Sequence, residues 1–207
     1  MVIISVILTQ KNRKQGKSML KNYILSLSIL SAILFQGCSD NKEKTENAQS
    51  VNQLVSTKEY VLTGIDQKQY VVKKEGAGFI LEGANDKIVI FDIFATWCPP
   101  CRAVAPHLSS LQEKYKEDII VIGVTIEDNI QNSKLQEFAE KYNAKYILVN
   151  SDQNRRLSDE IVKELGLGDR YPIPTMAMYK NAKLINHYVG ATAEEFIESD
   201  IKNALGK

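Results

Sequence analysis

From about residue 60 to the C-terminus, apolar and polar residues alternate in blocks with strand-like and helix-like spacing. Residues 87–95 and 119–125 are nearly continuous apolar runs rich in β-branched side chains, which is typical of strands buried on both faces. Between them, over residues 99–116, apolar side chains recur at intervals of three and four, as on one face of a helix. This order of elements predicts an α/β fold with a central sheet.

The pattern continues to the end of the chain. Helical spacing marks two more helices, over residues 135–142 and 157–165, with a short strand between them. Two strands joined by a four-residue turn follow, and Phe196, Ile197 and Ile201 mark a last helix. Ahead of the first buried strand, two short strand-like segments flank a turn-rich stretch and predict a hairpin. We therefore expect a mixed central β-sheet flanked by helices, an N-terminal β-hairpin extension, and an inserted helix and strand.

An apolar segment near the N-terminus has the character of a targeting signal. Residues 24–35 are apolar and follow a basic start. A dozen residues is closer to the hydrophobic region of a signal peptide than to the roughly 20 that a membrane span needs. Gly37-Cys38 at the end of the run resembles a bacterial lipobox, where the peptide is cut and the cysteine is lipid-modified. We expect a signal peptide region over 1–37 and lipid attachment at Cys38; a plain signal peptide and an uncut anchor are the alternatives.

The boundaries of the remaining segments follow from polarity. Met19 would start a compact signal peptide by itself, so we expect the true start there and no function for residues 1–18. Residues 38–57 are polar and of mixed charge, which predicts a flexible tether. The folded domain is expected over residues 58–207.

Composition and charge narrow the class of partners. The chain is 44% hydrophobic and 25% charged, as in ordinary globular proteins. Its first 37 residues hold five of the 26 Lys and Arg residues and no Asp or Glu, so the rest of the chain is mildly acidic. Phosphate binding needs a positive surface, and we therefore expect no nucleic-acid partner.

The motif Trp97-Cys98-Pro99-Pro100-Cys101 lies where a buried strand leads into a helix. A thiolate at a helix N-terminus is stabilised by the helix dipole and by free backbone N–H groups. Pro99 suits the first helical turn, because the missing N–H costs little there. In this arrangement Cys98 is the exposed nucleophile and Cys101 is the thiol that resolves the mixed disulfide.

Two other uses of the cysteine pair stay open. A zinc site would need two more ligands, and His107 and His187 are the chain's two histidines. A structural disulfide would carry no chemistry. We expect neither of these, and no cofactor beyond a redox-active disulfide between Cys98 and Cys101.

Residues 94–106 (FATWCPPCRAVAP) resemble the thioredoxin superfamily, and specifically its TlpA/ResA-type members, which are tethered to the membrane in the periplasm. A second block, Tyr171-Pro172-Ile173-Pro174-Thr175, is similar to the superfamily segment in which a cis-proline faces the active-site disulfide. The resemblance covers about residues 60–205. It implies a thioredoxin fold in which the inserted helix and strand precede the strand that starts after Pro174.

The resemblance also implies how a substrate is held. Pro174 would be the cis-proline, and its backbone and that of Ile173 would pair with an extended substrate segment. Trp97, Pro99 and Pro100 would line the same docking surface. The alternatives are an ordinary strand-entry proline for Pro174 and a core residue for Trp97.

Asp92 interrupts the apolar strand six positions before Cys98, where thioredoxin has a buried aspartate. Burial without a partner raises the pKa of a carboxyl group, which would let Asp92 take the proton from Cys101. A hydrated or hydrogen-bonded aspartate is the alternative. The cytochrome-c-maturation members of the group usually have Glu at the position of Val104, and commonly Asn at that of Asp92.

The direction of electron flow is predicted from the two residues between the cysteines. Pro99 and Pro100 bring no side-chain donor and remove two backbone N–H groups, so Cys98 should be less acidic and the pair more reducing than in DsbA. We expect a periplasmic oxidoreductase that reduces disulfides of extracytoplasmic proteins, with apocytochrome c as one candidate. Alternatives are a periplasmic oxidase or isomerase and, in another class, a non-catalytic peptide-binding module or chaperone.

The resemblance implies partners as well. A reductase outside the cytoplasm must be recharged, which implies a membrane electron donor of the CcdA/DsbD type. The lipid anchor would hold the protein on the periplasmic face of a bacterial membrane, inner or outer. We expect a monomer, because the chain shows no helical dimerisation arm.

Overall fold

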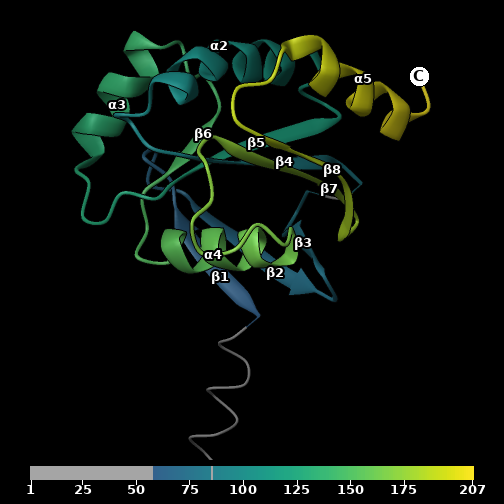
Figure 1. Cartoon of the computed structure of the whole chain (residues 1–207), viewed down its shortest axis with the longest axis horizontal. Coiled ribbons are helices and arrows are strands. Elements are labelled where there is room, and N and C mark those ends of the chain that lie inside the picture. The colour runs from purple at the N-terminus through teal and green to yellow at the C-terminus, as the bar shows by residue number, and fades with distance from the viewer. Residues whose placement is uncertain (1–57, 85) are drawn as a thin grey trace, which may run out of the picture. The chain divides into compact units, whose positions relative to one another are not determined.

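The computed structural model describes residues 58–84 and 86–207. The expected signal peptide, the lipid-attachment residue Cys38 and the tether lie outside these residues. A five-stranded sheet with the order β6-β5-β4-β7-β8 forms the centre (Figure 1). Its strands are β4 (Ile88–Phe94), β5 (Ile119–Thr125), β6 (Ile147–Val149), β7 (Thr175–Lys180) and β8 (Lys183–Val189). β4, β5 and β6 run parallel, whereas β7 pairs antiparallel with β4 and β8, so the sheet is mixed, as predicted.

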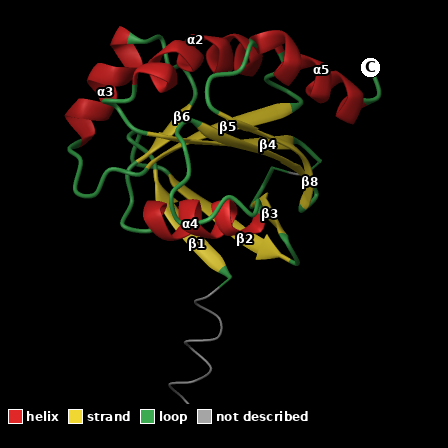
Figure 2. Ribbon diagram, in the orientation of Figure 1, coloured by secondary structure: helices red, strands yellow, loops and turns green. Residues whose placement is uncertain are grey.

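Two layers cover this sheet (Figure 2). One face packs against the helices α2 (Pro99–Lys114), α3 (Asn132–Lys141) and α5 (Glu194–Leu205). The other face packs against α4 (Asn154–Glu164) and a three-stranded antiparallel sheet of β1 (Glu59–Thr63), β2 (Gln69–Glu75) and β3 (Gly78–Leu81). In the part of the chain described, no helix has the length and apolar character needed to cross a bilayer.

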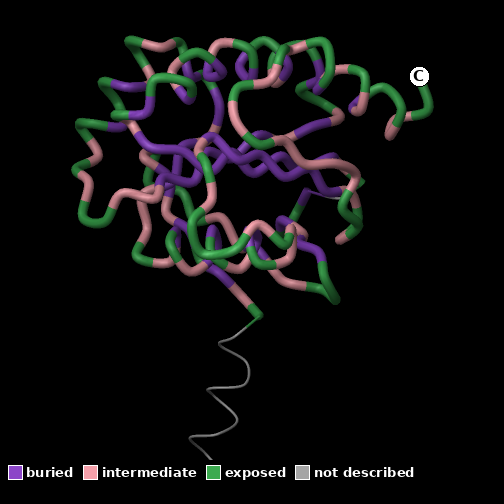
Figure 3. Tube along the Cα trace, viewed as in Figure 1, coloured by how far each residue is buried: buried purple, intermediate pink, exposed green. Residues whose placement is uncertain are grey.

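The central strand β4 is buried along its whole length (Figure 3). Successive side chains of a strand point to opposite faces. Ile88, Ile90 and Phe94 accordingly belong to the core under α2, whereas Val89, Phe91 and Ile93 belong to the core under α4. Asp92 has the parity of the first group, so it lies on the face that α2 covers.

The N-terminal hairpin and the last helix are both present, as predicted. The N-terminal hairpin has a third strand, β3, whose four residues are too few to show alternation. Its Phe79 is buried, and its ring centroid lies 5.5 Å from that of Tyr179. In the last helix Ile197 and Ile201, four residues apart, form the buried face, whereas Phe196 is 67% exposed.

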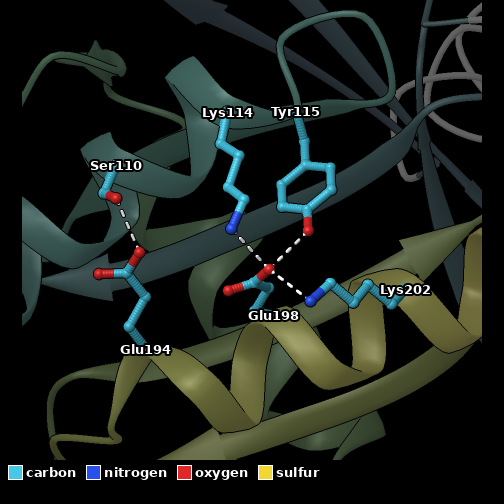
Figure 4. A network of polar contacts seen from close by, with 6 residues as sticks. All are labelled: Ser110, Lys114, Tyr115, Glu194, Glu198 and Lys202. Atoms are coloured by element: carbon cyan, nitrogen blue, oxygen red, sulfur yellow. Dashed lines mark hydrogen bonds and ion pairs between the residues drawn. The ribbon is translucent and has the colours of Figure 1, made fainter. Parts of the chain in front are cut away.

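Hydrogen bonds and ion pairs between polar side chains connect α5 to α2 and to Tyr115 at its C-terminal end (Figure 4). They are Ser110, Lys114, Tyr115, Glu194, Glu198 and Lys202. Glu198 accepts from the Lys114 ammonium at 2.8 Å and the Tyr115 hydroxyl at 2.7 Å, and it pairs with Lys202 at 2.8 Å. These partners lower the pKa of Glu198 to about 2. α2 is therefore held by its neighbour helix as well as by the sheet.

Candidate active site

The two cysteines lie where the chain leaves the sheet and enters α2. Cys98 caps the N-terminus of this helix in an extended conformation, with φ −79° and ψ 113°. A disulfide joins it to Cys101, one helical turn later, and the two Cα atoms are 5.3 Å apart. The backbone N–H of Cys101 donates to the Cys98 sulfur, with 3.2 Å between nitrogen and Sγ. The helix N-terminus therefore provides the N–H environment in which a thiolate is stabilised.

Cys98 is less accessible than the predicted exposed nucleophile. Both cysteines are only 2% exposed. A loop that is distant in sequence lies against Cys98, since the Ile173 carbonyl oxygen is 3.6 Å from its Sγ. The helical pattern places Cys98 at a helix end but does not show which loop packs there, so the predicted exposure was wrong. Trp97, Pro99 and Pro100, next to the two cysteines in the chain, are exposed.

Trp97 lies on the surface beside the disulfide and is not a core residue. It is 60% exposed, which is unusual for so large an apolar ring. It lines a hollow of about 180 Å³ together with Thr96, Arg102, side chains of α3 and Tyr142, which follows α3. An exposed aromatic ring beside the disulfide offers an apolar surface.

The second sequence block meets the first in space, 75 residues further along the chain. The Ile173–Pro174 peptide bond is cis. Pro174 is buried and Ile173 is half-buried. β7 starts immediately afterwards at Thr175, and its pairing with β4 brings the Ile173 carbonyl to Cys98. The structure therefore brings together the cysteines, Trp97 and the Ile173-Pro174 segment.

The histidines that were considered as zinc ligands have other contacts. His107 Nδ1 lies 3.1 Å from a carboxylate oxygen of Glu194. The backbone N–H of His187, in β8, donates to the side chain of Asn186 at 2.8 Å. Within residues 58–84 and 86–207, no group of three or more His, Cys, Asp or Glu side chains is placed to hold a metal ion.

Asp92 is buried in the middle of β4 and is 2% exposed. Its Oδ2 accepts a hydrogen bond of 3.1 Å from the Tyr146 hydroxyl, whereas its Oδ1 is buried and has no hydrogen-bond partner among the described residues. Burial raises the pKa of Asp92 to about 7, and the bond from Tyr146 opposes part of that rise. Asp92 is thus removed from solvent, as the first hypothesis predicted, and it is also hydrogen-bonded, as the alternative predicted.

The backbone just before Trp97 is held from both sides. The Glu127 carboxylate accepts from the Thr96 backbone N–H at 2.6 Å and from its hydroxyl at 3.0 Å. The Arg102 guanidinium donates to the Thr96 carbonyl at 2.8 Å. Hydrogen bonds to charged groups are stronger than neutral ones. Glu127 and Arg102 therefore fix the peptide that leads into the cysteine motif.

Sequence reasoning missed Tyr146, Glu127 and Arg102. A signal for Glu127 was present, because it lies just after the apolar run that forms β5, which is parallel to β4. The carboxyl ends of neighbouring parallel strands meet at one sheet edge, so a polar residue there is expected near Cys98. Tyr146 precedes a short strand and gave no comparable signal.

Comparison with known protein families matches residues 70–205 to Redoxin, which is about two thirds of the chain. The chain belongs to the redoxin family. Thiol-disulfide oxidoreductase ResA of Bacillus cereus is 25% identical over 184 residues, which cover 86% of this chain and 92% of that one. Thioredoxin-1 of Schizosaccharomyces pombe is 31% identical, over 58% of this chain and 84% of its own. A thiol:disulfide interchange protein of Chlorobium tepidum has a similar fold, with a TM-score of 0.54 at 20% identity, over 72% and 94% of the two chains.

These matches and the cysteine pair define the class of this redoxin-family chain. It is a TlpA/ResA-type member of the thioredoxin superfamily with a thioredoxin fold. It is a thiol–disulfide oxidoreductase, and its structure contains the Cys98–Cys101 disulfide.

Replacing Glu127 with alanine should loosen the active-site loop. The Thr96 N–H and hydroxyl would lose their acceptor, and we expect oxidoreductase activity to fall several-fold, since a charge-assisted bond contributes about 1.5–3 kcal/mol. Trp97 is the single tryptophan of the chain, so its fluorescence anisotropy reports loop motion directly and should decrease. Asp128→Ala, at the neighbouring position, is the control. Unchanged anisotropy in Glu127→Ala would show that the carboxylate does not hold the loop.

Proposed function

We propose that this protein is a periplasmic, lipid-anchored reductase of disulfides in extracytoplasmic proteins. The observation that carries the reductive direction is the sparse set of donors around the Cys98 sulfur. Pro99 and Pro100 occupy the first helical turn and have no N–H, which leaves the Cys101 N–H as the first backbone donor of the helix, and it binds Cys98 Sγ. A weakly stabilised thiolate makes the reduced form less stable and the pair more reducing.

In the proposed reaction, the Cys98 thiolate attacks one sulfur of a substrate disulfide. A Cys98–substrate disulfide forms, and the other substrate sulfur leaves as a thiolate. Cys101 then loses its proton, attacks Cys98 Sγ and releases the second substrate thiolate. The substrate gains two electrons, and the Cys98–Cys101 disulfide is formed.

Asp92 is the proposed acceptor of the Cys101 proton. It lies on the α2 face of β4, the face on which both cysteines are buried. A pKa of about 7 leaves the carboxylate partly ionised at neutral pH and able to hold a proton. General bases work best when their pKa is near the operating pH.

The substrate is proposed to lie against Trp97, Pro99 and Pro100 and to pair with the backbone at Ile173-Pro174. The exposure of Trp97 and the short distance from the Ile173 carbonyl to Cys98 support this placement. An extended peptide bound to backbone groups is selected by its conformation more than by its sequence, so varied protein disulfides fit. Apocytochrome c falls within this class, but Val104 replaces the Glu usual in the cytochrome-c-maturation members.

Localisation and electron supply complete the proposal. Lipid attachment at Cys38 would hold the domain on the periplasmic face of the membrane. Each turnover leaves the cysteine pair oxidised, so a membrane donor of the CcdA/DsbD type must return two electrons. The ResA relatives support this setting by their similarity.

The reduction potential of the Cys98–Cys101 pair tests the proposed direction. The full chain in detergent would be equilibrated with a glutathione or dithiothreitol series, and the dithiol fraction measured by alkylation. We expect a potential of about −250 mV or lower, near that of thioredoxin. A value around −120 mV, as in DsbA, would make the protein an oxidase.

A further inference from the structure

Tyr146 and Asp92 form a buried pair, 54 positions apart in the chain. Tyr146 is 9% exposed and Asp92 is 2% exposed. The tyrosine hydroxyl donates to one carboxylate oxygen, Oδ2, at 3.1 Å. The other oxygen, Oδ1, is buried without a hydrogen-bond partner among the described residues. The two oxygens of one carboxylate are therefore unequal: one is occupied and one is left free.

Gly123 makes this contact possible. It lies directly beside Asp92 in the neighbouring strand β5. A Cβ atom on Gly123 would lie 2.7 Å from Leu148 Cδ2, closer than packed carbon atoms come, and 3.0 Å from Tyr146 Cε2, which is tighter than most such contacts. Its φ is not positive, so space rather than backbone conformation accounts for glycine here. A glycine inside a central strand marks a close approach, and the groups that approach Gly123 are the Leu148 side chain and the Tyr146 ring.

The other titratable groups in this core, on the α2 side of the sheet, have different contacts. They are Cys98, Cys101, Tyr115, Tyr142 and Tyr188. Tyr115 donates to Glu198, Tyr188 donates to Asp200, and the Tyr142 ring packs against the Arg102 guanidinium and the Lys141 ammonium. Met176 pairs with Asp92 from β7, and the same core takes apolar side chains from α3 (Leu135 and Phe138) and from α5 (Ile197 and Ile201).

We propose that Tyr146 is a positioning residue for the resolving step: it binds Asp92 Oδ2 and keeps the carboxylate ionised, so that Oδ1 accepts the Cys101 proton. This inference rests on the proposed role of Asp92. A hydrogen bond to the charged form of a buried acid favours that form, whereas burial alone would keep the acid neutral and unable to take a proton. In the step, the Cys101 S–H bond breaks and its proton goes to Oδ1. The Cys101 thiolate then bonds to Cys98 Sγ, and the substrate leaves as a thiolate.

The test compares Tyr146→Phe with Tyr115→Phe in the full chain. Both variants keep the ring and remove a buried hydroxyl that donates to a carboxylate, but only Tyr146 contacts Asp92. The reduced protein would be mixed with an aromatic disulfide that releases one coloured thiolate when Cys98 attacks and a second when Cys101 resolves. The pKa of Asp92 would be measured in the same variants from its carboxyl carbon resonance.

In Tyr146→Phe we expect the pKa of Asp92 to rise by about one unit, which is a tenfold change in its protonation equilibrium. The pH midpoint of the second phase, the release of thiolate by Cys101, should rise by the same amount. From a value of about 7, this change makes the second phase about fivefold slower at pH 7. Gly123→Ala, which crowds the ring while keeping the hydroxyl, should give a shift of the same sign. Tyr115→Phe should leave both the pKa and the second phase unchanged.

Two outcomes would overturn the inference, and Asp92→Asn in the same assay separates them. If Asp92→Asn slows the second phase but Tyr146→Phe leaves the midpoint and the pKa of Asp92 unchanged, Tyr146 does not position Asp92. If Asp92→Asn leaves the second phase unchanged, the proposed proton transfer to Asp92 fails, and the inference fails with it.

Discussion

Replacing Cys98 with serine should abolish disulfide reduction. Cys98 caps α2 and carries the sulfur that faces Ile173, and in the proposed reaction it forms the bond to the substrate. A serine hydroxyl is not ionised at neutral pH and cannot replace a thiolate nucleophile. We expect the rate of insulin disulfide reduction to fall on the order of 10³-fold or more.

Cys101→Ser is the matched control, since it removes the same disulfide but leaves the nucleophile. This variant should also fail to turn over, yet it should accumulate a covalent Cys98–substrate adduct that mass spectrometry detects and dithiothreitol reverses. Cys98→Ser should form no such adduct. A Cys98→Ser variant that still reduces insulin at the full rate would show that Cys98 is not the nucleophile, and an adduct on Cys101 would reverse the assigned roles.

The parts of the site that are local in sequence could be predicted, and the parts made by distant contacts could not. The apolar run over 87–95 and the helical spacing after Pro99 place the cysteine pair at a strand-to-helix junction. Burial of β4 on both faces leaves a continuous apolar run in the sequence, and burial of α2 on one face leaves apolar residues at intervals of three and four. The position of Asp92 in that run also showed that it would be buried.

Tyr146 and the burial of Cys98 left no such record. Tyr146 reaches Asp92 across β5, and this depends on the absence of a side chain at Gly123. The Ile173 carbonyl reaches Cys98 only when β7 pairs with β4. The apolar spacing also did not show that Phe196 is exposed, because a helix of about three turns can bury Ile197 and Ile201 and leave an adjacent ring in solvent.

Asp92→Asn should make the protein more stable above neutral pH and slower in the resolving step. Burial raises the pKa of Asp92 from 3.8 to about 7 in the folded state. The folded protein therefore binds this proton more tightly than the unfolded chain does. The stability that Asp92 contributes is fully present below pH 4 and is lost as the pH rises through about 7. Asparagine is neutral at every pH and avoids this loss.

Urea unfolding of the reduced proteins at pH 4 and pH 8 measures the effect. The difference in unfolding free energy between Asp92→Asn and the natural chain should widen by roughly 4 kcal/mol in favour of asparagine, from a pKa change of about three units at 1.36 kcal/mol each. Asp118→Asn, at an aspartate that pairs with Lys207 near the surface, controls for the change in formal charge. A constant difference from pH 4 to pH 8 would show that Asp92 is not desolvated in the folded state.

The Asp92→Asn variant should also resolve the mixed disulfide more slowly than the natural chain. Without a base for the Cys101 proton, the resolving phase should slow by about 10²–10⁴-fold and lose its pH midpoint near 7, while attack by Cys98 continues. If stability rises and the resolving phase does not change, the buried carboxylate is not the base, and the proton of Cys101 leaves by another route. If both changes appear together, an ionisable group that costs stability is retained at the centre of β4 for its role in proton transfer.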